Sequence, residues 1–98
     1  MFICENITKN ERGHLCFAGQ DTLKLAEKYS TPLYLLDEDR IRRNCRIYVD
    51  AFRKYFPAGS LPLYASKANS FKQIYRIVAE ESMGIDVVSC GEIYTAMQ

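Results

Sequence analysis

The chain has 98 residues, enough for one small domain, and its 48% hydrophobic and 26% charged residues are ordinary for a soluble globular protein. Thirteen basic and twelve acidic residues nearly cancel, which removes the strongest electrostatic reason to expect nucleic acid or an anionic membrane as a partner. No apolar run approaches the roughly 20 residues that a membrane span needs, and the start lacks the basic-then-apolar order of a signal peptide. We therefore expect a cytoplasmic protein that acts on a small molecule or contacts another protein.

The first stretch of the chain predicts a small β structure followed by a short helix. Two apolar pieces, Phe2–Cys4 and His14–Phe17, flank a polar segment and indicate a hairpin or two edge strands. Asp21 is expected to cap a helix over residues 22–29. The segment Ser30–Pro32 then ends that helix, because a residue before proline avoids helical geometry.

The cysteines and the single histidine do not predict a metal site. Cys4, Cys16, Cys45 and Cys90 form no C-x-x-C pair, and His14 is the only histidine. In a reducing cytoplasm we expect free thiols, although Cys4 and Cys16 could face each other across a hairpin. His14, alone in a turn, is predicted to be structural rather than catalytic.

From residue 33 onward, strands and helices alternate. An apolar strand over 33–36 precedes a helix over about 38–56, which Pro57 and Gly59 stop. The basic side chains of this helix lie among acidic ones, so a solvated outer face is favoured over a nucleic-acid face. Its apolar side chains recur at helical spacing and form the predicted buried stripe: Ile41, Cys45, Tyr48, Val49, Phe52 and Phe56.

A second strand, over residues 61–66, ends at Lys67. The helix that follows is predicted to begin with a capping box of Ser70 and Gln73 and to end at Gly84. This order of strand, turn and helix repeats the pattern of the preceding segment.

A third strand, over 85–88, leads to Ser89 and Glu92, a capping box that opens another helix. Strands that alternate with helices indicate parallel βα units with right-handed crossovers. Such strands are apolar on both faces and need cover on both sides. Because a (β/α)8 barrel takes roughly 250 residues, we expect this chain to be the front of a longer α/β protein.

Lys67 is the candidate catalytic residue. Strand alternation predicts that Leu63, Ala65 and Lys67 share one side, where the small alanine leaves room for a flat ligand. A lysine amine in a water-poor site is a nucleophile that forms a Schiff base with a carbonyl such as that of pyridoxal phosphate. The alternative is a solvated lysine that closes a strand. Asp86 interrupts the next strand, and a buried carboxylate there needs a cation, for which Lys67 is the expected partner.

Three motifs carry a resemblance to a known family: Thr31–Tyr34, Tyr64–Asn69 and Asp86–Glu92. Together they resemble the pyridoxal-phosphate barrel decarboxylases, a group related in fold to alanine racemase. Within that group they are similar to the diaminopimelate decarboxylases, as is the opening segment Asn10–Leu15. The resemblance covers essentially the whole chain.

The resemblance implies a fold and a site. Residues 1–19 would belong to a β-rich second domain, and residues 20–98 would form the first βα units of a pyridoxal-phosphate-binding (β/α)8 TIM-type barrel. Lys67 matches the family lysine that forms the internal aldimine with pyridoxal 5'-phosphate. Ala65 matches the wall of the cofactor strand, and Asp86 matches an acidic position near the cofactor.

Three further positions are placed by the same resemblance. Glu92 matches a family glutamate, although helix capping explains it equally well. Ser66 stands where many relatives carry a branched apolar residue, and Cys90 stands where a small residue is common. We expect neither departure to affect the chemistry.

The function implied by the resemblance is pyridoxal-phosphate-dependent decarboxylation of meso-2,6-diaminopimelate to L-lysine, in lysine biosynthesis, by a cytoplasmic homodimer. The alternatives are a related decarboxylase acting on ornithine, arginine or carboxynorspermidine, an amino-acid racemase, and a catalytically silent homologue. The resemblance also implies that the glycine-rich phosphate cradle and the acidic partner of the pyridine nitrogen lie outside this stretch, and that a second subunit contributes substrate-binding residues across the dimer. We therefore expect this stretch alone to be inactive.

Overall fold

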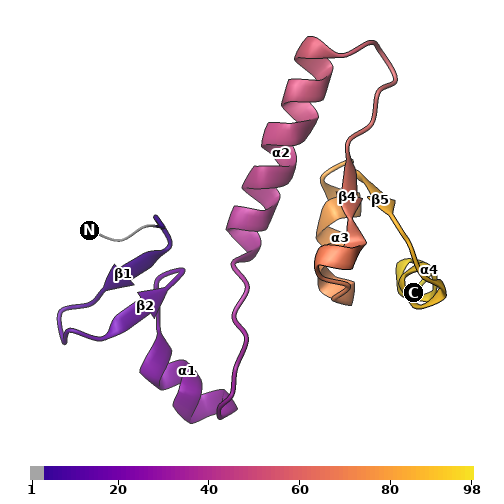
Figure 1. The fold of residues 1–98 in the computed structure, drawn as a ribbon. Helices are drawn as coiled ribbons and strands as arrows, with labels where there is room; N and C mark the ends of the chain where they lie inside the picture. Colours follow the sequence, from indigo (N-terminus) through magenta and orange to yellow (C-terminus); the bar gives the residue numbers. More distant parts are fainter. Residues whose placement is uncertain (1–3) are drawn as a thin grey trace. The chain divides into compact units, whose positions relative to one another are not determined.

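The computed structural model describes residues 4–98. The chain divides into two compact units, Met1–Asp37 and Glu38–Gln98 (Figure 1). This division separates a small antiparallel sheet with one helix from a βα arrangement. The predicted boundary between residues 19 and 20 concerns the domains of a complete enzyme and stays a prediction.

The first unit contains the predicted hairpin, with a different first strand. Strands β1 (Ile7–Lys9), β2 (Leu15–Phe17) and β3 (Gln20–Asp21) form an antiparallel sheet in that order. The prediction of a strand over Phe2–Cys4 is wrong for Cys4, which lies in a bend; Phe2 and Ile3 lie outside the described residues.

The turn at Asn10 sets the register of this hairpin. The Asn10 Oδ1 atom accepts hydrogen bonds from the backbone N–H groups of Arg12, at 3.0 Å, and His14, at 2.9 Å. Gly13 has a φ of 79°, which glycine adopts without steric cost. Lys9 therefore pairs with the first residue of β2. Two of the three residues of the first strand, Thr8 and Lys9, are polar, so a search for apolar runs does not reveal it.

Helix α1 (Thr22–Tyr29) has the predicted bounds and the predicted cap. The Asp21 Oδ1 atom accepts a hydrogen bond from the Leu23 N–H at 3.0 Å. The strand predicted over residues 33–36 is absent, because these residues form no ladder with another described strand. An extended segment becomes a strand only when a neighbour takes up its backbone hydrogen bonds.

In the second unit, helix α2 (Glu38–Tyr55) begins at the predicted residue and ends one residue before the predicted end at residue 56. Its buried residues are Cys45 and Val49, both members of the predicted stripe. Tyr48 and Phe56 of that stripe are 60% and 54% exposed, so the apolar face is only partly covered.

A loop over residues 56–62 joins α2 to strand β4 (Leu63–Ala65). The Pro57 carbonyl accepts a hydrogen bond from the Ser60 N–H at 3.1 Å, and Gly59 has a φ of 88°. The predicted stop of the helix at Pro57 and Gly59 is confirmed. The loop enters β4 at the end opposite to Lys67.

The predicted parallel pairing is confirmed for the second and third of the three predicted strands. Strand β4 pairs in parallel with β5 (Gly84–Asp86), and Ala65 lies opposite Asp86. Helix α3 (Lys72–Glu80) follows β4, and helix α4 (Cys90–Ala96) follows β5. Figure 1 shows the two strands side by side, with α3 next to them.

The predicted ends of α3 are wrong in two details. Ser70 makes no capping bond, because the helix begins one residue later, after Phe71, whose N–H donates to Asn69 Oδ1 at 3.1 Å. At the other end, Ser82 takes the left-handed conformation, with a φ of 64°, and Gly84 is the first residue of β5. A Cβ on Gly84 would clash with the side chain of Leu63.

The core of the second unit lies between its helices and the sheet. Cys45, Ile74 and Val78 are buried there, and partly buried apolar residues pack against them: Ile41, Tyr64, Met83 and Ile85. Polar contacts reinforce this packing, because Glu81 Oε2 lies 2.7 Å from Arg46 Nε and Glu81 Oε1 lies 3.1 Å from Arg42 Nη1. The carboxylate of Glu81 thus links α2 to the end of α3.

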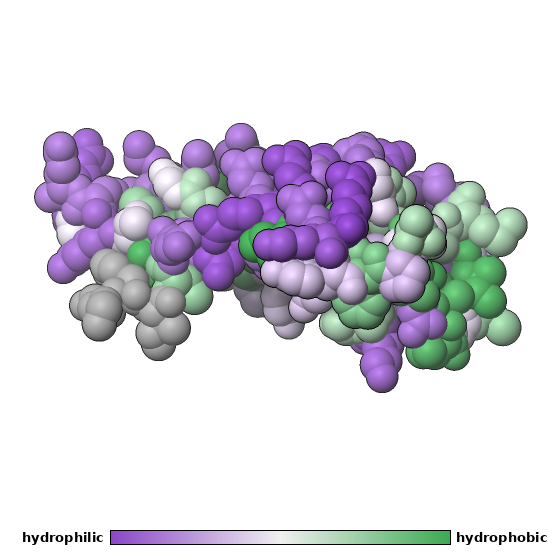
Figure 2. All heavy atoms as spheres, turned by 90° about the horizontal axis from the view of Figure 1, so that it is seen from above, coloured by the Kyte–Doolittle hydropathy of each residue, from purple (hydrophilic) through white to green (hydrophobic). Residues whose placement is uncertain are grey.

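Part of the apolar surface of the second unit is uncovered. In Figure 2, hydrophobic side chains gather at the right-hand end, on the side where β5 and α4 lie in Figure 1. Large apolar side chains in this unit that are about half exposed or more include Leu61, Leu63, Val88, Ile93, Tyr94 and Met97. Among residues 4–98, no helix combines the length and the apolar composition needed to cross a membrane.

Candidate functional site

A short 3-10 turn, η1 (Ser66–Ala68), places Lys67 directly after β4. The predicted strand over 61–66 is therefore too long, since strand geometry ends at Ala65. Leu63 and Ala65 share an exposed face as predicted, but the turn, not strand alternation, directs the side chain of Lys67. Lys67 is exposed and forms no ion pair within the part of the chain that the structure describes.

Asp86 ends the neighbouring strand. It is exposed, and residues 4–98 contain no ion pair between Asp86 and Lys67, so the expectation of a buried pair is wrong in this structure. Because the Asp86 side chain remains in contact with solvent, it needs no cation to offset a loss of hydration. The parallel register still brings Asp86 beside Ala65, at the same end of the sheet as Lys67.

The buried polar residue at this end of the sheet is Ser66. Its side chain is fully shielded from solvent. The Ser66 Oγ atom lies 2.9 Å from the Asp86 backbone oxygen and 2.8 Å from Glu92 Oε2. Sequence reasoning missed this contact, because Ser66 and Glu92 are 26 residues apart and only the pairing of β4 with β5 brings them together.

Glu92 forms hydrogen bonds through both its backbone and its side chain. Its backbone N–H donates to Ser89 Oγ at 3.2 Å, which confirms the predicted cap of α4. Its Oε2 atom accepts a hydrogen bond from the Val88 N–H at 2.8 Å. The Val88 N–H, the Ser66 hydroxyl and the nearby charge of Lys67 lower the pKa of Glu92, and the Val88 bond is the largest contribution. The carboxylate of Glu92 is therefore ionised and held beside the Lys67 turn.

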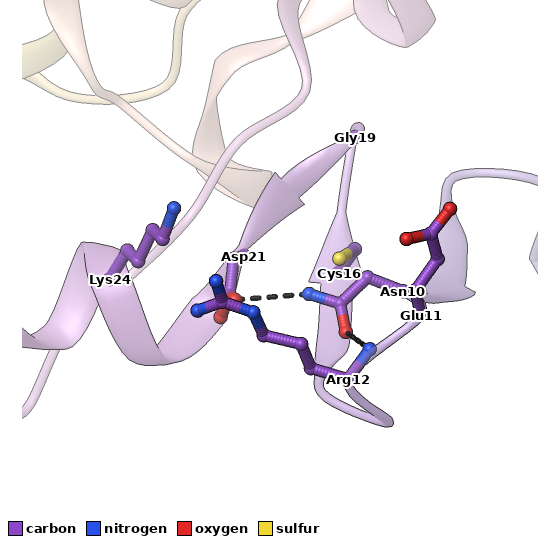
Figure 3. Close-up of a pocket in the computed structure, with 7 residues that line it drawn as sticks. All are labelled: Asn10, Glu11, Arg12, Cys16, Gly19, Asp21 and Lys24. Carbon is purple, nitrogen blue, oxygen red and sulfur yellow. Dashed lines mark hydrogen bonds between the residues drawn. The ribbon is translucent and has the colours of Figure 1, made fainter.

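A separate hollow of about 300 Å³ lies in the first unit (Figure 3). Two of its polar residues are hydrogen-bonded to each other, because the Asn10 amide donates to Asp21 Oδ2 at 3.0 Å. His14 Nδ1 lies 2.8 Å from the same oxygen. The bond to His14 is the main reason that the pKa of Asp21 is lowered. The hollow is lined by Asn10, Glu11, Arg12, Cys16, Gly19, Asp21 and Lys24. These contacts tie the turn to the start of α1, consistent with a structural role for His14.

The cysteines form no disulfide among the described residues. All four are free; Cys16 and Cys45 are buried, and Cys90 is exposed at the start of α4. Within residues 4–98, no group of three or more His, Cys, Asp or Glu side chains could hold a metal ion.

The residues at the carboxyl end of the β4–β5 sheet fit a cofactor that carries an aldehyde. The primary amine of Lys67 is exposed and not engaged in an ion pair, so it can reach a carbonyl carbon. Ala65 presents only a methyl group beside it, and Asp86 adds a carboxylate across the register. This arrangement supplies a nucleophile, open space and a charged neighbour at one edge.

A family model described as the pyridoxal-binding domain of pyridoxal-dependent decarboxylases matches residues 38–98. That range is more than half of the chain and contains the sheet, the Lys67 turn and Glu92. The chain belongs to this family. The family assigned from the sequence motifs is thereby confirmed.

Curated relatives and solved structures agree with this membership. The chain is 47% identical over 92 residues to a diaminopimelate decarboxylase of Methanothermobacter thermautotrophicus, covering 94% of this chain and 21% of the relative. It is 42% identical over 99 residues to that of Bacillus subtilis, covering 99% of this chain and 22% of the relative. The crystal structure of diaminopimelate decarboxylase from M. jannaschii in complex with L-lysine matches with a TM-score of 0.82 and 35% identity, over 99% of this chain and 23% of that one.

These matches confirm the predicted α/β fold as that of the N-terminal part of such enzymes. The chain spans about a fifth of the length of the curated relatives.

Proposed function

We propose that the full-length protein containing this chain is a diaminopimelate decarboxylase, which converts meso-2,6-diaminopimelate to L-lysine with pyridoxal 5'-phosphate. The observation that carries the proposal is the exposed Lys67 at the end of β4, inside the segment that matches the pyridoxal-binding family. Relatives with 36–47% identity over nearly the whole chain bear this enzyme's name. The related structure in complex with L-lysine contains the product of the proposed reaction.

The proposal extends to the fold and assembly of the full-length protein. We infer that β4 and β5 are early strands of a (β/α)8 barrel and that residues 1–19 join a β-rich second domain. The exposed apolar side chains along these strands and α4 support this, because the strands of such barrels are covered on both faces. We further propose that the protein is a cytoplasmic homodimer.

The residues of this chain have distinct tasks in the proposed reaction. Lys67 would hold the cofactor, because its primary amine can condense with the aldehyde that the cofactor carries. Ala65 leaves space beside the cofactor, and Asp86 places a negative charge at the same edge of the sheet. Glu92 is ionised and places a second negative charge near Lys67. When bound, the cofactor ring takes up the electron pair left by the loss of carbon dioxide.

The assignment of Lys67 is tested by trapping. The full-length protein is incubated with pyridoxal 5'-phosphate, reduced with borohydride and digested, and the modified peptide is identified by mass spectrometry. We expect the modification on Lys67, and we expect Lys67→Arg to abolish it because the guanidinium group is not a nucleophile at neutral pH. Modification of a different lysine in the wild-type protein would contradict the assignment.

The substrate is tested by comparing kcat/KM for carbon dioxide release from meso-2,6-diaminopimelate, ornithine, arginine and carboxynorspermidine. We expect diaminopimelate to be preferred over every other substrate. A higher kcat/KM for one of the other substrates would assign the protein to that branch of the family. Loss of optical activity from a single amino acid without release of carbon dioxide would identify a racemase instead.

A further inference from the structure

We propose that Ser66 is a positioning residue: its buried hydroxyl ties the turn that carries Lys67 to the carboxylate of Glu92 and so fixes where the lysine amine lies. The inference rests on the proposed function only in assigning Lys67 to the cofactor. It differs from the expectation drawn from the sequence, which treated the serine at this position as having no effect on the chemistry.

The position of Ser66 makes it suited to this task. Ser66 is the first residue of η1 and the immediate neighbour of Lys67, so a constraint on its side chain is a constraint on the turn. It is fully buried, and a hydroxyl shielded from water costs free energy unless it is hydrogen-bonded. Its single O–H proton is shared between two acceptors on other elements, because Oγ lies 2.9 Å from the Asp86 carbonyl oxygen and 2.8 Å from Glu92 Oε2.

The position of Glu92 is fixed by hydrogen bonds to its backbone and to its carboxylate. Its backbone N–H is bound to Ser89 Oγ, and its carboxylate receives the Val88 N–H. The Ser66 hydroxyl adds a further donor on the same oxygen, Oε2. A carboxylate fixed in this way presents its charge to Lys67 from a constant direction, and hydrogen bonds to a charged group are about twice as strong as those between neutral groups.

Removing the hydroxyl has two expected consequences. Glu92 loses one of the donors that keep its pKa low, and the turn loses its link to α4. The Lys67 side chain then samples a wider range of positions relative to the carboxylate. Both effects act on Lys67 through Glu92, not through contact of Ser66 with the cofactor.

The test compares Ser66→Thr with Ser66→Val in the full-length protein. The two variants have nearly the same volume and differ by a hydroxyl in place of a methyl group, so any strain from the added branch is common to both. The first readout is the affinity for pyridoxal 5'-phosphate. We expect Ser66→Val to weaken it about tenfold, the order expected for one charge-assisted hydrogen bond, and Ser66→Thr to stay close to the wild type.

A second readout uses the cofactor-free protein. The rate at which an acylating reagent modifies Lys67 is measured across pH by mass spectrometry, with the exposed Lys72 as an internal reference. In Ser66→Val, the turn that carries Lys67 loses its link to Glu92, and we expect Lys67 to react several-fold faster relative to Lys72. A general loss of folding would change the rates of modification of both lysines together. This readout remains informative even if borohydride trapping fails to label Lys67.

The coupling to Glu92 is tested by a double-mutant cycle. If Ser66 acts through Glu92, the effect of Ser66→Val disappears in a Glu92→Gln background. Ser66→Ala, which removes the hydroxyl without adding a methyl group, must show the same loss of affinity for pyridoxal 5'-phosphate. It replaces Ser66→Val if that variant fails to fold. The proposal is overturned if Ser66→Thr is as impaired as Ser66→Val, if both hydroxyl-free variants match the wild type, or if their effect persists unchanged in Glu92→Gln.

Discussion

Two tyrosines of the second unit differ in how their hydroxyl groups are satisfied. Tyr64 donates to the backbone oxygen of Asn69 at 2.9 Å. Tyr75 is only 4% exposed, and its hydroxyl has no hydrogen-bond partner among residues 4–98. A buried polar group without a partner destabilises the folded state, whereas a satisfied one contributes modestly to stability.

We therefore predict opposite responses to removal of the two hydroxyls. Tyr64→Phe should lower the free energy of unfolding by about 1 kcal/mol, and Tyr75→Phe should leave it unchanged or raise it by up to about 1 kcal/mol. The two variants serve as matched controls in urea denaturation of the full-length protein. A loss of stability in Tyr75→Phe as large as that in Tyr64→Phe would show that the Tyr75 hydroxyl is bound in solution.

At the scale of elements, the carboxylate of Glu81 joins helix α2 to the end of α3. Hydrogen bonds from Arg46 and then Arg42 hold the pKa of Glu81 below its usual value near 4.5. A carboxyl group whose pKa is lower in the folded than in the unfolded state stabilises the fold above the unfolded value. That contribution is lost as the pH falls below about 4.5 and passes through the lowered value.

We predict that Glu81→Gln is destabilising at neutral pH and that its stability difference from the wild type shrinks as the pH falls below about 4.5 and passes through the lowered pKa of Glu81 in the folded state. Thermal unfolding at several pH values measures this. Asp50→Asn is the control, because Asp50 and Arg53 form an ion pair with both side chains more than two thirds exposed, which is worth little. A difference for Glu81→Gln that does not vary with pH would contradict the assigned cause.

At the scale of the whole molecule, the exposed apolar side chains predict how the isolated chain behaves. A parallel sheet of two strands leaves both edges and much apolar surface open. We predict that the 98-residue chain alone aggregates or binds a hydrophobic dye, and that it releases no carbon dioxide from meso-2,6-diaminopimelate. Light scattering and dye fluorescence, with the full-length protein as the control, measure this. A monomer with cooperative unfolding would be the contrary result.

Features governed by local signals could be predicted from the sequence. Asp21 caps α1 and Ser89 caps α4 as expected, because a cap depends on residues two or three positions away. The segment 33–36 was wrongly predicted as a strand, because an apolar run does not show whether a pairing neighbour exists. The family motifs single out Lys67 as the proposed cofactor lysine. The contact between Ser66 and Glu92 depends on the pairing of two strands and could not be predicted from the sequence.

The loop over residues 56–62 provides a practical attachment point. It enters β4 at the end away from Lys67, and Ala58 and Gly59 are exposed at its turn. In barrels of this class the chemistry lies at the carboxyl ends of the strands, and the opposite face serves stability. An affinity tag or a fluorophore inserted between Ala58 and Gly59 therefore lies away from the proposed site at Lys67.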